Sequence, residues 1–120
     1  MFDRLDCVCL HTDDLEASLT FVTSMGLRES WRLYREDAGR PWTIVGLDFP
    51  DTPSSQLVFS THPDRRTIEV EIRVKDVRHA CDLLRQIPGV TLIAEPFAIE
   101  AGHVAVITAP DGNAFVLIGD

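Results

Sequence analysis

The chain has 120 residues, of which 45% are hydrophobic, and a formal net charge of −8 at pH 7. This composition is enough for one domain with a core of ordinary size and excludes a disordered chain. The acidic balance excludes a nucleic-acid or anionic-membrane partner, because either would need a clustered basic surface that the sequence lacks.

The first ten residues, MFDRLDCVCL, do not have the pattern of a signal peptide. No later stretch approaches the roughly 20 apolar residues of a membrane helix. The three cysteines are an odd number, and two of them would project from the same side of one strand, where a disulfide is awkward. We therefore expect a cytoplasmic protein with reduced thiols and no membrane partner.

The first predicted element is a strand with a two-residue alternation. Apolar Val8 and Leu10 point to one side, and the other side carries Cys7, Cys9 and His11. Asp14 follows and is well placed to accept the free amide hydrogens of a helix start. An apolar stripe at helical spacing comes next, made of Leu15, Leu19, Val22 and Met25. Gly26 ends this predicted helix.

Three strand-like runs follow the helix, over about 28–36, 42–49 and 55–61. The turn-forming segments EDAGRP and FPDTPSS separate them. The segment THPDRR, residues 61–66, is polar and contains a proline, so it is predicted to be a surface linker.

The second half repeats the first half. Residues 67–80 have the pattern of residues 5–18 at an offset of 62. The apolar side of the strand carries Val70, Ile72 and Val74, and the polar side carries Glu69, Glu71 and Arg73. After a second capping aspartate, Asp76, the helical stripe consists of Val77, Ala80, Cys81, Leu84 and Ile87, and Gly89 ends it. Strands are predicted at about 90–98, 103–108 and 113–118.

This order predicts an α+β domain over residues 1–120, built from two βαβββ units at about 1–61 and 67–120. The apolar strand faces would pack against the helices on the outside. The curved mixed sheets would then enclose a concave cup, whose polar residues are left for function.

The segments LDCVCLHTDDLEASLTFVTSMGL and GHVAVITAPDGNAFVLIGD carry a resemblance to a known family. The first resembles the opening strand and helix of the vicinal oxygen chelate superfamily, the glyoxalase, bleomycin-resistance and ring-cleaving dioxygenase group. The second resembles its Pro-Asp-Gly-Asn turn and last strand. The resemblance covers nearly the whole chain and is specific to the fold rather than to one activity.

The resemblance implies a divalent-metal site with one ligand from the first and last strand of each unit, usually His, Glu or Gln. The matching positions are Cys7 and Glu69 on the first strand of each unit, and Gln56 and Val116 on the last strand of each unit. Gln56 is matched to Val116 by a shift of 60 residues. A set with a soft thiolate, two oxygen ligands and a valine does not suit the usual ion. We therefore expect no metal cofactor; if a metal binds, Cys7, Gln56 and Glu69 are its candidate ligands.

Other candidate ligand-binding residues are Cys9, His11, Glu71, Arg73 and His103. The alternative is a solvated strand face or rim packing. Glu71 and Arg73 could pair with each other, or Arg73 could bind an anionic group with its forked guanidinium. No acidic partner that would orient His11 is identifiable, which weakens a Cys-His catalytic pair. A flat ligand could stack on Trp31, Tyr34, Trp42 and Phe97, which could equally be core or dimer contacts.

The favoured function is a metal-free protein that binds a small, cationic or aromatic molecule in the cup, like the bleomycin-resistance branch. One alternative is a divalent-metal-dependent lyase, isomerase or dioxygenase of the same superfamily. The other is a non-catalytic sensory or partner-binding module. Members of this length commonly form homodimers, and a symmetric homodimer is expected here.

Overall fold

The computed structural model describes residues 1–51 and 53–120. Their fold is α+β, with eight strands and two helices in two βαβββ repeats, which confirms the predicted fold class. The residues form two compact units. We call Cys7–Ile68 the N-terminal unit, and Met1–Asp6 together with Glu69–Asp120 the C-terminal unit. The first six residues thus belong with the second half of the chain, which the repeat pattern alone did not indicate.

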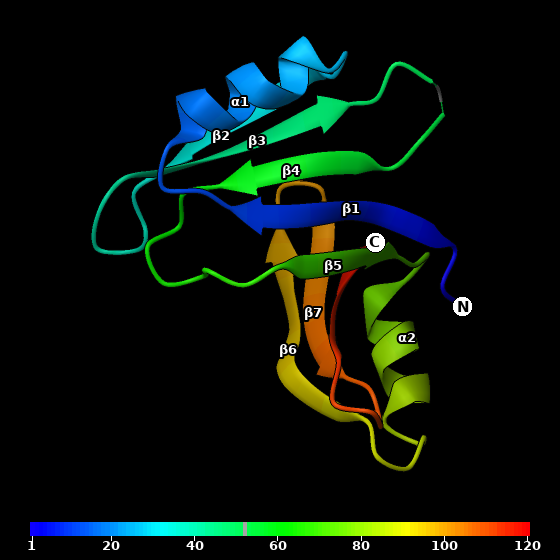
Figure 1. Cartoon of the computed structure of the whole chain (residues 1–120). Coiled ribbons are helices and arrows are strands. Elements are labelled where there is room, and N and C mark those ends of the chain that lie inside the picture. The colour runs from blue at the N-terminus through cyan, green and yellow to red at the C-terminus, as the bar shows by residue number, and fades with distance from the viewer. Residues whose placement is uncertain (52) are drawn as a thin grey trace. The chain divides into compact units, whose positions relative to one another are not determined.

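The N-terminal unit contains a mixed four-stranded sheet and one helix (Figure 1). Its elements in chain order are β1 (Arg4–His11), α1 (Leu15–Ser24), β2 (Arg28–Arg35), β3 (Trp42–Asp48) and β4 (Gln56–Ser60). The strand order is β2-β3-β4-β1, with β1 and β4 parallel and the other neighbours antiparallel. The first three residues of β1 belong to the C-terminal unit.

The C-terminal unit repeats this arrangement. Its elements are β5 (Glu69–Arg73), α2 (Val77–Leu84), β6 (Thr91–Ile99), β7 (Gly102–Thr108) and β8 (Ala114–Gly119). The strand order is β5-β8-β7-β6, with β5 and β8 parallel and the rest antiparallel. All six strands predicted after the helices lie within two residues of their expected ends.

Both helices begin at the predicted aspartates. The Asp14 carboxylate accepts the backbone N–H of Ala17 at 3.1 Å, and that of Asp76 accepts the N–H of His79 at 3.0 Å. Each bond satisfies one of the amide hydrogens that a helix start leaves without an intrahelical partner.

The helix ends differ from the predicted stripes. Met25 lies beyond α1 and is 66% exposed, and Ile87 lies beyond α2 and is 47% exposed. Neither residue belongs to a core, because α1 ends at Ser24 and α2 ends at Leu84, and each predicted apolar stripe continues past the end of its helix.

Each helix covers one face of its own sheet, because the apolar residues of the strands alternate. In the N-terminal unit the core under α1 consists of Leu19, Val22, Leu27, Val45, Leu47 and Phe59. In the C-terminal unit the core under α2 consists of Val74, Val77, Ala80, Cys81, Leu84, Ala105, Ile107 and Leu117. The predicted orientation is confirmed by Leu10 and Ile72, which pack against these two cores. The other face of each sheet is left for the polar residues of β1 and β5.

The segment 61–66 is not entirely at the surface. His62 is only 9% exposed, and its ring meets that of Trp42 edge to face at 4.7 Å between centroids. Its Nδ1 accepts the backbone N–H groups of Asp64 and Arg65 at 3.1 and 3.2 Å. The predicted linker is thus anchored to the N-terminal unit by a buried histidine.

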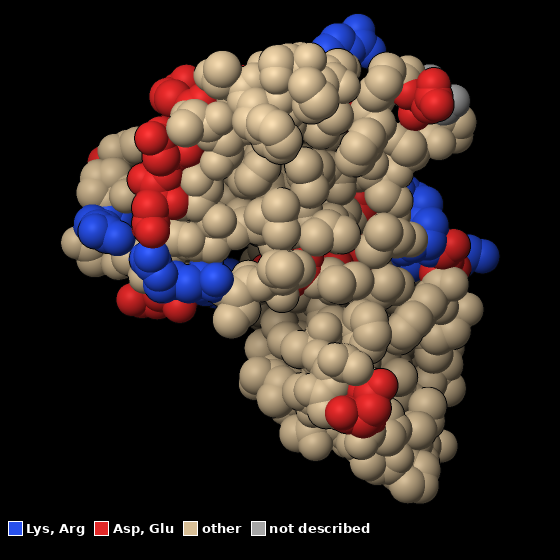
Figure 2. Space-filling model, viewed as in Figure 1, with Lys and Arg blue, Asp and Glu red and all other residues tan. Residues whose placement is uncertain are grey.

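Within the part of the chain that the structure describes, neither helix is long and apolar enough to cross a membrane. On the face shown in Figure 2, acidic and basic side chains are interspersed with other residues and form no extended basic surface. This distribution agrees with the acidic net charge of −8.

Candidate functional site

The face of the C-terminal sheet that α2 does not cover is called here its open face. Strand pairing sets two rows of side chains on it, Glu71–Val116–Val106–Ala94 and Arg73–Ile118–Val104–Phe97. Within these rows, Val104, Val106, Val116 and Ile118 are half-buried. Such a surface, apolar in the middle and charged along β5, suits an organic molecule with an apolar body and a charged group.

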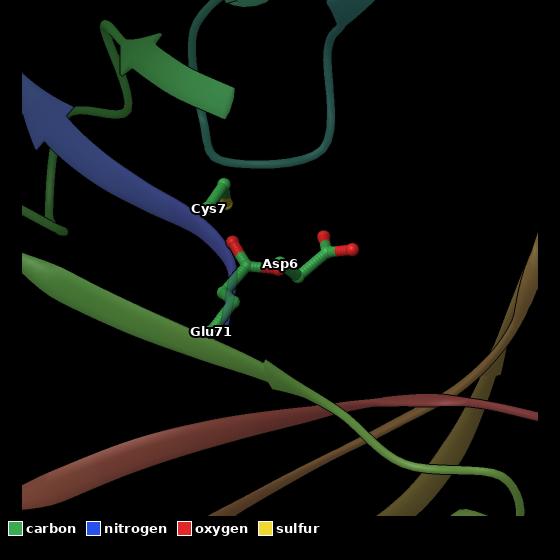
Figure 3. A group of neighbouring side chains, drawn as sticks. All are labelled: Asp6, Cys7 and Glu71. Carbon is green, nitrogen blue, oxygen red and sulfur yellow. The ribbon is translucent and has the colours of Figure 1, made fainter. Parts of the chain in front are cut away.

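The β5 edge of the open face is acidic. The carboxylate oxygens of Asp6 and Glu71 lie within 4.8 Å of one another; Figure 3 shows both, with Cys7 drawn as the next residue after Asp6. Arg73 donates from Nε to Oδ1 of Asp6 at 3.1 Å, and the Arg4 guanidinium lies 3.8 Å from the same oxygen. Glu69 adds a further carboxylate on β5, two residues before Glu71.

The Asp6–Arg73 ion pair is a contact that the sequence did not predict. The two residues are 67 positions apart, and no local pattern marks Asp6. The pair is partly buried, with side-chain exposures of 20% for Asp6 and 34% for Arg73. The Nε–H of Arg73 is therefore already engaged, which weakens the predicted role of this residue as an anchor for a ligand anion.

The open face of the N-terminal sheet, the one that α1 does not cover, is filled by its own side chains. Cys7 and Cys9 are 3% and 7% exposed and form a buried cluster with Val58, against which Trp31 and Ile44 pack. The two thiols do lie on the same side of β1, as predicted. Both thiols are buried, and side chains from β2 and β3 pack against the cluster that they form with Val58.

Gln56 is held at both ends of its amide group. Its Oε1 accepts the indole N–H of Trp31 at 2.8 Å, and its Nε2 donates to Oδ1 of Asp48 at 2.8 Å. These two bonds give Gln56 a packing role within the N-terminal unit, and its predicted ligand role remains untested.

His11 has an acidic neighbour two residues along the chain, next to the predicted cap Asp14. Its Nε2 lies 3.8 Å from Oδ1 of Asp13, and the His11 side chain is 9% exposed. Asp13 also accepts from the Arg66 guanidinium at 2.7 Å. The carboxylate is thus shared with an arginine and lies beyond hydrogen-bonding distance of the imidazole.

His103 does not lie on the open face. It precedes Ala105 and Ile107 on the same side of β7, and both belong to the core under α2. Its Nδ1 is buried and has no hydrogen-bond partner among residues 1–51 and 53–120. The strand alternation turns His103 toward the helix side, so its predicted place at the mouth of a ligand site on the open face stays a prediction without support from this geometry.

The four aromatic residues considered for stacking lie in different surroundings. Trp31 packs on the buried cluster of Cys7, Cys9 and Val58. Trp42 contacts His62 and donates from Nε1 to Asp37 at 2.7 Å. Tyr34 and Phe97 are 60% and 44% exposed. Phe97 is the one that shares a row with the open face of the C-terminal unit.

The equivalence of β4 and β8 follows from two matching backbone hydrogen bonds. The N–H of Thr12 donates to the carbonyl of Ser60 at 3.0 Å, and that of Val74 donates to the carbonyl of Ile118 at 2.9 Å. Thr12 and Val74 are equivalent by the offset of 62. Ser60 and Ile118 are therefore equivalent too, at an offset of 58 rather than the predicted 60.

This register changes one predicted equivalence and bears on the metal site. Val116 corresponds to Val58, and Gln56 corresponds to Ala114. The positions that the resemblance matches to metal ligands are Cys7, Gln56, Glu69 and Val116, of which Val116 offers no donor atom. Gln56 already uses both ends of its amide group. With a valine at one position and a soft thiolate beside oxygen donors, this set does not fit the usual divalent metal ion.

A cavity of about 310 Å³ lies on the helix side of the C-terminal unit. It is lined by Met1, Asp3, Val74, Lys75, Asp76, His79, Ala80 and Leu83. None of the site residues predicted from the sequence lines it, and its Asp76 is already engaged as the helix cap.

Comparison with known proteins identifies the fold. No protein-family model matches the chain, and no curated protein matches it significantly. Among solved structures, a methylmalonyl-CoA epimerase has a TM-score of 0.75 at 20% identity, over 98% of this chain and 94% of the epimerase.

Two further solved structures have the same fold. A Streptomyces coelicolor methylmalonyl-CoA epimerase variant in complex with 2-nitronate-propionyl-CoA has a TM-score of 0.73 at 18% identity, over 100% of this chain and 96% of the epimerase. A glyoxalase/bleomycin resistance protein/dioxygenase superfamily member from Vibrio splendidus 12B01 has a TM-score of 0.62 at 17% identity, over 95% of each chain. At these identities the likeness establishes the fold, and it confirms the one predicted from the sequence resemblance.

Proposed function

We propose that this chain, which has the vicinal oxygen chelate fold, binds a small organic cation with an apolar body on the open face of its C-terminal unit. The observation that carries the proposal is the position of the acidic edge around Glu71 directly beside half-buried aliphatic side chains. The family's usual divalent metal is not part of this proposal, because Val116 occupies one of the four ligand positions that the resemblance implies.

The two parts of the face supply different contributions to binding. Burying apolar ligand surface on the valines contributes about 25 cal/mol per Å². A charge pair at about 4 Å contributes on the order of 1 kcal/mol in water and about 4 kcal/mol near a protein surface. The apolar part therefore holds the ligand body, and the acidic edge selects cations over neutral analogues.

A second candidate function is a metal-dependent isomerase, which is favoured by the likeness to the methylmalonyl-CoA epimerases. The side chains at Cys7, Gln56, Glu69 and Val116 oppose it, because the valine offers no ligand atom. The sensory module, the symmetric homodimer and the cytoplasmic location expected from the sequence stay predictions.

Isothermal titration calorimetry with a matched pair of probes tests the proposal. 4-Phenylbutylamine is a cation at pH 7, and 4-phenylbutanol has nearly the same shape without the charge. The amine is expected to bind, more weakly as salt is added, and the alcohol to bind at least about tenfold more weakly, since tenfold corresponds to about 1.4 kcal/mol. Glu71→Gln is expected to weaken amine binding by about the same factor.

Glu36→Gln is the matched control, because it removes the same charge from an exposed residue of the other unit. It should leave amine binding within about twofold of the unaltered protein, since distant exposed charges are screened by salt. Equal binding of amine and alcohol, equal losses in the two variants, or no binding of the amine would overturn the proposed function.

A further inference from the structure

The two open faces of the chain carry equivalent rows with different contents. In the N-terminal unit the row across the four strands is Cys9–Val58–Gly46–Trp31. In the C-terminal unit it is Glu71–Val116–Val106–Ala94. A glycine and a tryptophan in the first row thus replace a valine and an alanine in the second.

The indole of Trp31 occupies the space that the missing side chain of Gly46 leaves. A Cβ atom built on Gly46 would lie 2.1 Å from Nε1 of Trp31 and 2.2 Å from its Cε2. Such distances are far inside van der Waals contact, so no other amino acid fits at position 46 while the ring stays in place. The glycine therefore forms the floor of a slot that the indole fills.

The slot also recognises the edge of the ring. Gln56 accepts the indole N–H, and Asp48 fixes the orientation of the Gln56 amide by accepting from its Nε2. The walls are the buried thiols Cys7 and Cys9 with Val58. A glycine floor, walls of small buried side chains and one oriented acceptor are the features of a binding site for a planar aromatic molecule with an N–H donor.

We propose that Trp31 is a built-in ligand, which occupies in the N-terminal unit the site that remains open in the C-terminal unit. The chain thus has one ligand face that is filled by its own indole and one that is free for a ligand from outside. The statement that the C-terminal face is free for a ligand from outside rests on the proposed function, whereas the slot beneath Trp31 does not depend on it.

Indole itself is the probe for the slot. Trp31→Ala is expected to bind one indole per chain and to gain several degrees in Tm at saturating indole, whereas the unaltered protein shows no such shift. Benzofuran has the same shape without the N–H group and is expected to bind roughly fivefold more weakly, the value of one hydrogen bond of about 1 kcal/mol. Trp42→Ala is the control, since Trp42 packs on His62 rather than over Gly46.

A double-mutant cycle gives an independent readout. Gly46→Ala is expected to lower Tm by roughly 5 °C or more when Trp31 is present, and by much less when it is combined with Trp31→Ala. If Trp31→Ala does not fold alone, refolding on addition of indole supports the proposal, and Trp31→Leu takes its place in the cycle.

The proposal is overturned if indole neither binds nor refolds the Trp31 variants, or if Gly46→Ala has the same effect in both backgrounds. Neither experiment involves the cation probe. A protein that passes them and fails to bind 4-phenylbutylamine would keep the built-in ligand and lose the proposed function.

Discussion

Among single residues, Cys81 shows how the fold changes the chemistry of a side chain. It is 0% exposed in the core under α2. Burial raises the pKa of its thiol, because the thiolate would lose its hydration, and the nearby Arg85 lowers that pKa by a smaller amount. The residue therefore acts as a small apolar side chain, as the helical stripe predicted.

The raised pKa of Cys81 makes stability depend on pH in the alkaline range. Its contribution is fully present below the unfolded-state thiol pKa of about 8.5 and is lost as the pH rises through the higher folded pKa. Replacing Cys81 with Ala should therefore make the decrease in unfolding free energy between about pH 8 and pH 10 less steep. Urea denaturation under reducing conditions measures this, and parallel curves for the two proteins would contradict it.

Among the secondary-structure elements, α2 depends strongly on its ends. It has eight residues, Val77–Leu84, and helices this short are marginal without capping and packing. Its inner side contacts the core through Val77, Ala80, Cys81 and Leu84, and its start is fixed by Asp76.

The Asp76 cap leads to a prediction about the contribution of the α2 start to stability. Asp76→Ala should lower the free energy of unfolding by about 1 kcal/mol, because the N–H of His79 loses its acceptor. Asp76→Asn should retain most of that stability, since the amide oxygen can still accept the bond. Urea denaturation distinguishes the two, and an equal loss in both variants would show that the charge of Asp76, and not the hydrogen bond, is what matters.

For the molecule as a whole, the side chains at the four positions that the sequence resemblance matches to metal ligands bear on whether metal chemistry is expected. Val116 offers no donor atom, and Cys7 is only 3% exposed. The remaining Cys7, Gln56 and Glu69 are one short of a closed shell of four ligands.

Metal analysis tests this set of donors. Protein purified without a chelator or an affinity tag, then incubated with nickel, zinc, manganese or ferrous ions and desalted, should hold well under one equivalent of metal. Near-stoichiometric metal that disappears in Glu69→Ala would contradict this expectation and favour the isomerase. Metal that persists in Glu69→Ala would indicate a site elsewhere in the chain.

Local signals predicted most of the fold, and long-range pairing decided most of the site. The caps at Asp14 and Asp76 and the strand alternation are properties of short segments, so the sequence shows them directly. The cover over the cluster of Cys7, Cys9 and Val58 includes Trp31, whose strand β2 is separated from β1 by β3 and β4 in the sheet order, and which follows a register shift after Glu29. The ion pair of Asp6 with Arg73 also depends on long-range pairing, since no local sequence pattern indicates that these two residues meet.

The fit of Trp31 over Gly46 has a consequence for how this sequence can change. A side chain larger than hydrogen at position 46 is excluded only while an indole lies above it, so the two positions are not free to vary independently. Homologues with a bulkier residue at position 46 should have a small residue at position 31, as the valine and alanine at positions 106 and 94 already do in the other repeat. The C-terminal repeat thus shows the alternative combination within the same chain, with a larger side chain at the position equivalent to Gly46 and a small one at the position equivalent to Trp31.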